Sequence, residues 1–318
     1  MANTNTASDA LRIMRDLIRS VEQVIIGKRL AVELTVNALA CRGHVLIEDV
    51  PGVGKTSLAA ALAKSCACTF RRVQFTPDIM PSDITGFSIY NPKSGDFDYK
   101  PGAVMSQFVL ADEINRASPK TQSSLLEVME ENQVTVDGVT YPVPEPFMVL
   151  ATQNPVEYLG TYPLPEAQLD RFFLRVTLGY PSASDESKML SRFKAGSPLD
   201  TLRAVADEAQ IKTLQHAVDA VYVDTHLNGY IVDLARCTRV MEDVTLGASP
   251  RASLYLYKSA KAWALYQGRE YVIPDDVIKV APHVLTHRIL LKQESRVKKI
   301  TAADVVRHAL EIVRVPSI

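Results

Sequence analysis

Short apolar runs alternate with segments of helical periodicity along the first half of the chain. Five runs are continuous and flanked by turn-forming residues: 45–47, 73–75, 108–111, 148–151 and 173–176. Continuous runs of this kind are typical of parallel strands that are buried on both faces of a sheet. With helical segments between them, they predict an α/β fold, a three-layer sandwich with a parallel central sheet.

The chain changes character after Pro181. Residues 183–318 show mostly helical patterns and few β-branched runs. Asp207 and Thr301 are each followed three residues later by a partner that completes a capping box, which predicts a helix start at each of them. We therefore predict two domains, an α/β domain over residues 1–182 and a smaller all-α domain over residues 183–318.

Three segments depart from the alternation of strands and helices. Residues 1–8 are polar, and we expect them to form a disordered tail. Residues 77–103 are rich in Pro, Gly, Asp and Tyr, which indicates an insertion of irregular composition. Residues 132–147 contain Asp137-Gly138 between β-prone residues, which is a strong signal for a β-hairpin.

The composition is that of an ordinary globular protein, with 47% hydrophobic and 22% charged residues among 318. The net charge of -1 provides no global attraction to nucleic acid or to anionic membranes. None of the four cysteines has the paired spacing of a zinc site. The N-terminus lacks the apolar region of a secretory signal, and no apolar run approaches the roughly 20 residues of a membrane span. We expect a cytoplasmic protein.

A glycine-containing loop links the first predicted strand to a helix that begins near Lys55. Its backbone N–H groups can all face a phosphate only if Gly52 and Gly54 adopt unusual backbone angles. The helix N-terminus adds unpaired N–H groups and the positive end of its dipole. Lys55 would reach the β- and γ-phosphates, and the Thr56 hydroxyl would bind Mg²⁺. The predicted phosphate-binding residues are Pro51, Gly52, Val53, Gly54, Lys55, Thr56 and Ser57.

One position of this loop departs from the usual P-loop pattern. Asp49 stands where the pattern has its first glycine, whereas the stretch from Pro51 to Thr56 is intact. The alternative is a chance Gly-Lys-Thr sequence in a loop. The preceding strand and the following helix favour a phosphate site, because that context is what confirms the motif.

Two acidic residues, Asp112 and Glu113, end the third apolar run. The C-terminal ends of parallel strands line the ligand crevice of such sheets. Asp112 would hold Mg²⁺ through its water shell, and Glu113 would activate the attacking water as general base. The alternative is an ordinary helix N-terminus, because Ser118-Pro119 begins a helix soon afterwards. Together with the P-loop, the pair favours a protein that binds and hydrolyses ATP.

These features resemble the MoxR family of AAA+ ATPases, and the resemblance covers nearly the whole chain after about residue 10. It implies an AAA+ core followed by an α-helical lid domain, with ATP and Mg²⁺ as ligands. The motifs that carry it lie at 43–46, 74–78, 81–86, 111–117, 151–155, 164–172 and 247–252.

The resemblance implies roles for several polar residues. Asn154 is similar to the sensor-one residue, which contacts the γ-phosphate or orients the water, although an Asn-Pro turn is the alternative. Arg171 is similar to the arginine finger that reaches the ATP of a neighbouring subunit, and a surface salt bridge with Asp170 is its alternative. Arg251 resembles sensor two on a helix of the lid, and Arg116 resembles a second interfacial arginine.

The start of the chain resembles the AAA+ segment that packs on the adenine. Ile25, Ile26 and Gly27 match that segment, and the resemblance implies that they contact the base. Lys28 departs from the family, in which Gln often follows the glycine. A polar contact by the side chain at this position is therefore in doubt.

Other segments resemble parts that couple hydrolysis to movement. Gln74 would be a polar partner that restrains Glu113. Residues 77–103 resemble the helix-2 insert, and the hairpin at 132–147 resembles the pre-sensor hairpin. Both would face the pore or the top surface of a ring. The alternative is that they are surface loops without such a role.

The resemblance implies a homo-oligomeric ring, most simply a hexamer. ATP would lie between the two domains of one subunit, and Arg171 of the neighbour would complete the site. MoxR relatives act as chaperone-like remodellers, often with a partner that carries a von Willebrand factor A domain, and assist assembly of protein complexes or insertion of metal cofactors. A protein client and a separate partner of that kind are implied here.

Three other functions stay open. A nucleic-acid motor shares the insert and the hairpin, although the sequence has no basic run and argues against a nucleic-acid partner. The motor subunit of a metal chelatase is close in architecture and differs mainly in its partner. A nucleotide-gated binding module with little turnover would need neither Glu113 nor Arg171, and both are present.

Overall fold

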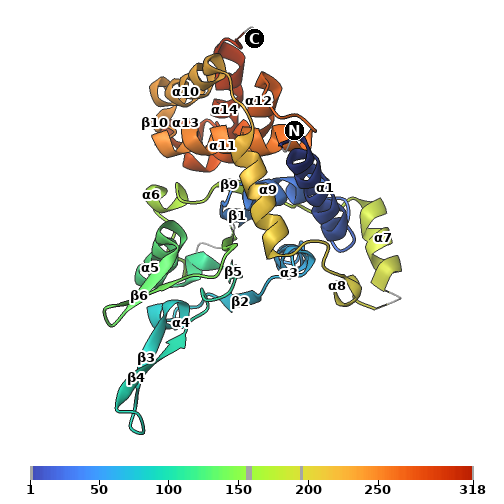
Figure 1. Cartoon of the computed structure of the whole chain (residues 1–318). Coiled ribbons are helices and arrows are strands. Elements are labelled where there is room, and N and C mark those ends of the chain that lie inside the picture. The colour runs from blue at the N-terminus through green and yellow to red at the C-terminus, as the bar shows by residue number, and fades with distance from the viewer. Residues whose placement is uncertain (1–2, 155–159, 194–195, 317–318) are drawn as a thin grey trace.

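Five parallel strands form the central sheet of the computed structural model, which describes residues 3–154, 160–193 and 196–316. The strand order is β2-β5-β8-β1-β9 (Figure 1). Each predicted apolar run overlaps one of these strands, so the prediction of an α/β fold with a parallel central sheet is confirmed. The strands are β1 (Val45–Glu48), β2 (Phe70–Gln74), β5 (Phe108–Asp112), β8 (Met148–Gln153) and β9 (Leu174–Val176).

Alternate residues of the strands enter two different hydrophobic cores. Val45 and Ile47 of β1 belong to the larger core, which also includes residues of the first three helices. Leu46, between them, belongs to the smaller core on the other face of the sheet, with residues of α5. Helices therefore cover both faces and give three layers. These helices are α1 (Asn3–Glu22), α2 (Arg29–Ala40), α3 (Lys55–Ser65), α4 (Pro81–Thr85), η1 (Ile114–Arg116), α5 (Pro119–Glu131) and α6 (Glu166–Leu169).

Residues 3–8 are helical, so the expectation of a disordered tail over residues 1–8 was wrong for the part that the structure describes. The first helix, α1, already begins at Asn3. Its apolar face extends back to Ala7, which packs against the larger core, and to Ala10, which is fully buried. Burial of this face stabilises a helix that its polar first turn alone does not predict.

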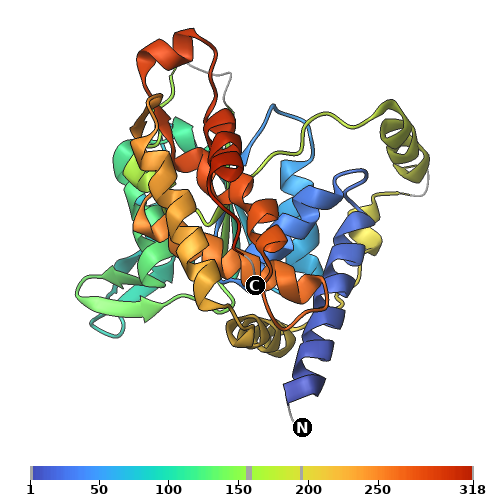
Figure 2. The ribbon, with the colours of Figure 1, turned by 90° about the horizontal axis from the view of Figure 1, so that it is seen from above.

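Helices make up most of the remaining chain and pack beside the sheet (Figure 2). Capping boxes at Asp207 and Thr301 open α9 and α14, as the sequence predicts. A short antiparallel pair, β10 with β11, adds strand structure to this helical part. The division at residue 182 stays a prediction. The elements are α7 (Ala183–Phe193), α8 (Pro198–Thr201), α9 (Glu208–Ala220), α10 (Thr225–Val240), β10 (Val244–Leu246), α11 (Pro250–Tyr266), α12 (Pro274–Leu285), η2 (Thr286–Arg288), β11 (Leu290–Leu291), α13 (Gln293–Val297) and α14 (Ala302–Ile312).

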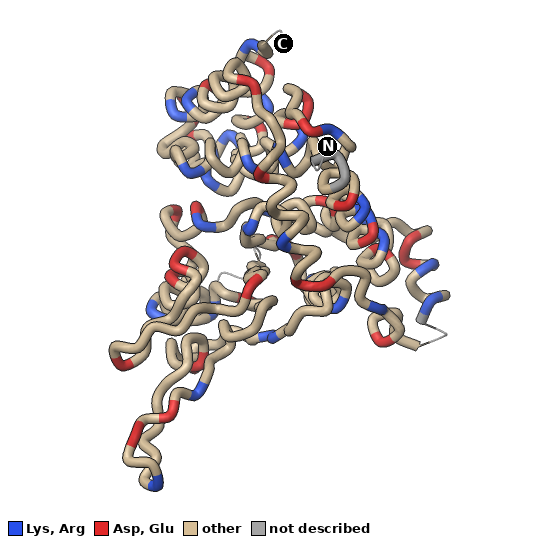
Figure 3. Tube along the Cα trace, viewed as in Figure 1, with Lys and Arg blue, Asp and Glu red and all other residues tan. Residues whose placement is uncertain are grey.

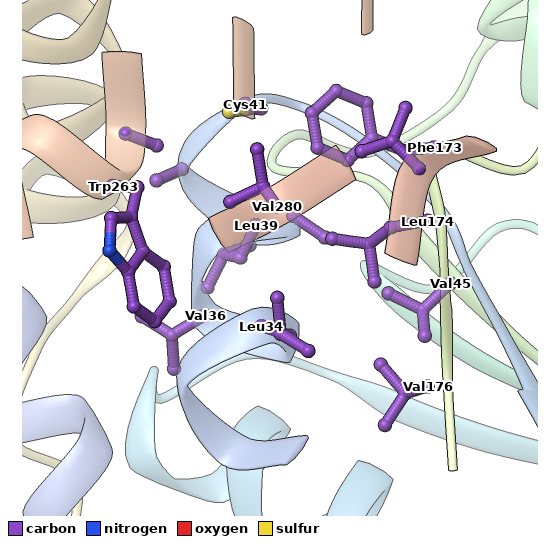
Figure 4. Packing of buried hydrophobic residues seen from close by; sticks show 14 of the residues in the cluster. Leu34, Val36, Leu39, Cys41, Val45, Phe173, Leu174, Val176, Trp263 and Val280 are labelled. Carbon is purple, nitrogen blue, oxygen red and sulfur yellow. The ribbon is translucent and has the colours of Figure 1, made fainter. Parts of the chain in front are cut away.

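The larger core joins the helical part to the sheet without a break. Trp263 of α11 and Val280 of α12 belong to the same cluster as Leu34 of α2 and Leu174 of β9 (Figure 4). Moving these helices off the sheet would expose apolar surface to water, which costs a free energy of about 25 cal/mol per Å². The helices α11 and α12 are therefore held firmly against α2 and the edge strand β9. Among the described helices, none combines the length and the apolar character that a membrane crossing requires.

Two hairpins project from the α/β part. The insertion contains α4 followed by β3 (Gly86–Asn91) and β4 (Asp96–Pro101), which form a long hairpin that extends away from the sheet (Figure 1). The second hairpin pairs β6 (Gln133–Val136) with β7 (Val139–Pro142). Its turn is Asp137-Gly138, and both residues have positive φ, 51° and 80°. That geometry is the one an Asp-Gly turn favours.

His44 is a buried histidine that joins three elements. Its Nδ1 accepts a hydrogen bond of 3.0 Å from the Val149 N–H of β8, and its Nε2 lies 3.0 Å from the Met129 carbonyl oxygen of α5. Burial lowers the pKa of the ring to about 4. Because Nδ1 accepts a hydrogen bond, the neutral ring is the form that fits this position.

We expect the free energy of unfolding to decrease as the pH falls from about 6.5 to about 4. A histidine in the unfolded chain binds a proton near pH 6.5, whereas His44 in the fold binds one near pH 4. The unfolded state therefore binds more protons in this window, and stability is lost as the pH falls through it. The loss from His44 at pH 5 is about 2 kcal/mol. Urea denaturation at pH 7.5 and at pH 5 measures it.

The control is the His44→Gln variant, which cannot take up a proton at this position. It should be less stable than the wild type at pH 7.5, because the buried contacts are altered, yet lose less stability on going to pH 5. An equal loss in both proteins would show that His44 does not carry this pH dependence.

Candidate active site

The chain turns sharply between β1 and α3, at Gly52 and Gly54. Their φ angles are 83° and 98°, in the region that favours glycine. Gly54 is the N-cap of α3, which begins at Lys55. The first N–H groups of a helix have no partner within the helix and carry the positive end of its dipole. This turn is therefore suited to bind an anion such as a phosphate group.

Asp49, the residue that departs from the P-loop pattern, ties the loop to the rest of the core. Its buried carboxylate accepts hydrogen bonds from the backbone N–H groups of Leu178 and Gly179, both at 2.6 Å. Its carbonyl oxygen accepts a hydrogen bond of 2.8 Å from Nζ of Lys55. A glycine could not provide the carboxylate, so Asp49 fixes the P-loop against the segment that follows β9.

Asp112 lies at the end of β5 and is almost fully buried. Its Oδ1 accepts a hydrogen bond of 2.6 Å from the hydroxyl of Thr152 on the neighbouring strand β8. Its Oδ2 accepts two from the guanidinium of Arg72 on β2, at 2.7 and 3.0 Å. The carboxylate is therefore oriented from both sides by the strands that flank β5.

Glu113 has a left-handed backbone, with φ 57° and ψ 48°, where non-glycine residues are rare and strained. Its N–H donates to the Thr152 hydroxyl at 2.8 Å. Its Oε2 accepts a hydrogen bond of 2.8 Å from the Gln74 amide and lies 2.9 Å from Nε of Arg116. Gln74 in turn accepts a hydrogen bond of 2.9 Å from Arg72. A polar network thus links the two acidic residues to β2.

These groups open into one pocket of about 360 Å³ at the C-terminal ends of the strands. The described part of the motif at 151–155 ends there with Asn154, and Pro155 lies outside the described residues. A volume in this range is typical of small-ligand sites. The lining consists of Pro51, Gly52, Gly54, Lys55, Thr56, Ser57, Arg72, Gln74, Asp112, Glu113 and Asn154.

A larger cavity, of about 450 Å³, lies between α1, α2 and the end of α11. Its lining includes Arg15, Arg19 and Arg29, and Arg29 pairs with Glu33 at 2.8 Å. The smaller pocket is the better candidate for a nucleotide, because it combines a helix N-terminus, a lysine and two carboxylates at the strand ends.

Some predicted site residues lie outside the described lining of the pocket. They are Ile25, Ile26, Gly27, Val53, Arg171 and Arg251.

The segment predicted to pack on adenine, residues 25–27, comes close to the P-loop. Ile25 is buried, and its Cδ1 lies 3.8 Å from the position that a Cβ atom on Gly54 would take. Ile26 is half-buried and Gly27 is exposed. The Lys28 ammonium donates a hydrogen bond of 2.7 Å to the Tyr180 carbonyl oxygen, so this side chain contacts the backbone.

Arg171 and Arg251 meet at one carboxylate, that of Glu130 on α5. Nε of Arg171 lies 2.9 Å from Oε2, and the Arg251 guanidinium donates to Oε1. Burial lowers the pKa of Arg251, but its hydrogen bond to Glu130 and nearby negative charges outweigh burial and raise that pKa above its ordinary value. The two guanidinium groups therefore lie together at one carboxylate.

The predicted alternative for Arg171, a salt bridge with Asp170, is not the contact observed. Asp170 instead pairs with Arg288, whose Nε lies 2.8 Å from its Oδ1. It also accepts hydrogen bonds of 2.9 and 2.8 Å from the hydroxyl of Ser249, the N-cap of α11. Asp170 thus joins the α/β part to the helical part.

The oxygen ligands in the pocket suit Mg²⁺. The Thr56 hydroxyl and the Asp112 carboxylate line the same pocket, and both are the hard oxygen donors that this ion prefers. Within the described ranges, no group of three or more His, Cys, Asp and Glu residues could hold a metal ion. A magnesium ion held by few protein ligands, water and phosphate needs no such group.

Three residues of these networks were missed from the sequence. Arg72 could have been found, since it lies two residues before Gln74 and thus on the same face of the strand. Thr152 directly follows the apolar run at 148–151 and lies inside the motif at 151–155, which is itself a signal. Glu130 has no local signal, because both of its partners are distant in the sequence.

Comparisons with known proteins show similarity over almost the whole chain. Residues 44–174 match the ATPase family associated with various cellular activities (AAA), and residues 236–309 match the AAA lid domain. An uncharacterized protein of Bacillus subtilis, YeaC, is 51% identical over 94% of this chain and 93% of its own length. Chaperone MoxR1 of Mycobacterium tuberculosis is 42% identical over 95% of this chain and 82% of its own length. A crystal structure of a candidate ATPase from Cytophaga hutchinsonii has a TM-score of 0.92 and 36% identity, and the match covers 99% of this chain and 98% of that one.

Proposed function

Because this chain belongs to the MoxR family of AAA+ ATPases, we propose that it acts as a chaperone-like remodeller in a ring of identical subunits, most simply a hexamer. The observation that carries the proposal is the division of the site. The pocket contains the groups for phosphate and water, whereas Arg171 and Arg251 lie outside its described lining and are partly exposed. A neighbouring subunit would supply these arginines.

Within the pocket, each group has a distinct task in hydrolysis. Lys55 and the N–H groups of the P-loop hold the β- and γ-phosphates of ATP. Asn154 orients the attacking water or contacts the γ-phosphate. Glu113 accepts the proton of that water as it attacks, which is the task of a general base.

Thr56 and Asp112 would hold Mg²⁺, the first directly and the second through water. The bound ion neutralises charge on the phosphates. Thr152 and Arg72 orient the Asp112 carboxylate toward the pocket. The two strands beside β5 therefore set the geometry of this site.

Gln74 controls Glu113 in this proposal. Its amide donates to the carboxylate oxygen Oε2, which Arg116 also approaches. These two contacts occupy the oxygen that would otherwise accept the proton of the attacking water. Release of the contacts would free this oxygen when hydrolysis is required.

The hairpin of β3 and β4 is the proposed contact surface for a protein client. It projects away from the sheet and exposes four large apolar side chains, and exposed apolar surface of this kind marks interaction sites (Figure 1). The resemblance to MoxR proteins also supports a partner with a von Willebrand factor A domain, and a task in protein complex assembly or metal cofactor insertion. The exposed residues are Phe87, Ile89, Tyr90 and Phe97.

The charge distribution gives little support to a nucleic-acid motor. Lys and Arg are interspersed with Asp and Glu along the trace, including the β3–β4 hairpin (Figure 3). Nucleic-acid binding sites concentrate positive charge on one face. A chelatase-type motor would differ in its partner and not in this site.

The test is the ATPase rate per subunit as a function of protein concentration, with the molecular mass measured in parallel. We expect the rate to rise steeply as rings form, because only a neighbour completes the site. A monomer with a rate that does not depend on concentration would contradict the ring and leave a self-contained nucleotide switch.

A further inference from the structure

Glu130 lies on a firmly held part of the backbone, at the end of α5. The carbonyl oxygen of its neighbour, Met129, lies 3.0 Å from Nε2 of His44. The helix ends at Glu131, and its C-cap is Asn132, whose N–H donates to the Val128 carbonyl oxygen at 2.9 Å. The backbone that carries Glu130 is thus fixed, while its side chain remains 36% exposed.

Two arginines from distant parts of the chain contact the two oxygens of this carboxylate. Arg171 follows α6 and contacts Oε2, and Arg251 lies in the first turn of α11 and contacts Oε1. Two guanidinium groups this close would otherwise repel each other, because like charges at short range are unfavourable. Glu130 is therefore the group that allows the two positive charges to lie together.

A second acidic residue fixes the backbone beneath both arginines. Asp170 precedes Arg171 directly, and it accepts hydrogen bonds from Ser249 and Arg288. Ser249 is the N-cap of the helix on which Arg251 is the second residue. The backbone at both arginines is held in this way. Glu130 then sets the position of their guanidinium groups.

Both guanidinium groups can be reached from outside. The side chains of Arg171 and Arg251 are 31% and 34% exposed. The nucleotide pocket of their own subunit does not include them in its described lining. A fixed pair of guanidinium groups on the surface is well suited to phosphate oxygens presented by another molecule.

We infer that Glu130 is a positioning residue, which holds Arg171 and Arg251 as one unit for the nucleotide bound to a neighbouring copy of this chain. The inference rests on the proposed function, since it requires a shared site. Glu130 itself does not contact the nucleotide. One carboxylate between two guanidinium groups leaves the unit a net positive charge, so it still attracts phosphate.

The experiment compares Glu130→Ala with Glu127→Ala, an exposed residue one turn earlier on the same helix. We expect Glu130→Ala to lower kcat by roughly 10- to 100-fold, because misplaced catalytic groups lose about that much. Its affinity for a fluorescent ATP analogue should equal that of the wild type, since its own pocket is intact. Glu127→Ala should keep the wild-type rate, and the thermal midpoints of both should change little.

Mixed rings distinguish an effect on the neighbour from an effect within the subunit. Lys55→Ala subunits should be defective in ATP binding but retain Glu130 and Arg171. Mixed with Glu130→Ala subunits, they should raise the rate above the sum of the two separate rates, because they supply a well-positioned arginine pair. Mixing Glu130→Ala with Arg171→Ala should give no such gain, since both subunits have a defective pair.

The outcomes separate this inference from the proposed function. A Glu130→Ala rate at or above that of the wild type would overturn the inference, and so would the absence of recovery with Lys55→Ala. If Arg171→Ala itself hydrolysed ATP at the wild-type rate, the shared site would be wrong, and the role of Glu130 with it. A slow Arg171→Ala beside a normal Glu130→Ala would reject the inference alone.

Discussion

We expect the Glu113→Gln variant to bind ATP with wild-type affinity and to hydrolyse it roughly 10²–10⁴-fold more slowly. Glutamine has nearly the same shape as glutamate, so the turn at this residue and the bond from Gln74 can persist. It lacks the carboxylate that we propose accepts the proton of the attacking water. The change therefore removes the proposed general base and leaves the phosphate-binding groups in place.

Two measurements decide this prediction. Equilibrium binding of a fluorescent ATP analogue reports affinity, and release of inorganic phosphate reports turnover. Glu131→Gln, an exposed residue on α5, is the matched control and should behave as the wild type. Hydrolysis by Glu113→Gln at the wild-type rate would show that another group takes the proton. Loss of ATP binding would instead show that Glu113 shapes the pocket.

The parts of the fold that depend on local sequence were predictable. A buried parallel strand needs a continuous apolar run, and each of the five runs lies at a strand of the sheet. Parallel strands also bring their C-terminal ends to one edge, which is why the P-loop and Asp112 could be expected to meet. The pocket that contains Lys55, Asp112 and Asn154 follows from this topology.

The parts that depend on distant side-chain contacts were not predictable. Arg251 pairs with Glu130, 121 residues away, and the choice of that partner depends on how α11 packs on the sheet. The partners of Asp49 were also not predictable. The sequence shows that Asp49 departs from the P-loop pattern, but it does not show which two N–H groups the carboxylate binds. The prediction of a disordered tail failed because α1 is stabilised by packing against the larger core and not by the helix propensity of its first residues.

The packing of the helical part affects how subunits would move in the proposed ring. The helices α11 and α12 share the core of the sheet, and Asp170 joins the two parts through Ser249 and Arg288. A movement of one subunit would then carry its arginine pair with it as a rigid unit. In the proposed ring, hydrolysis in one pocket would in this way change the contact with the next subunit.

Replacement of Arg171 by Ala should lower the ATPase rate by roughly 10³–10⁵-fold in assembled rings, the range that arginine fingers supply. In the proposed role, the guanidinium stabilises the charge that develops on the phosphate oxygens during transfer, so its loss should lower turnover. ATP affinity should stay near the wild-type value, because Arg171 lies outside the described lining of its own pocket. Phosphate release at a saturating protein concentration, with ring mass measured in parallel, gives the rate.

Arg171→Lys makes this prediction more specific. Lysine keeps the positive charge but lacks the planar fork that binds two oxygens at once. If geometry matters, Arg171→Lys should stay well below the wild type, although its charge is unchanged. Arg307→Ala, an exposed arginine on α14, serves as the control for simple loss of a surface charge. A wild-type rate for Arg171→Ala in intact rings would mean that the neighbour supplies no finger through this residue, and Arg251 would then be the arginine to test.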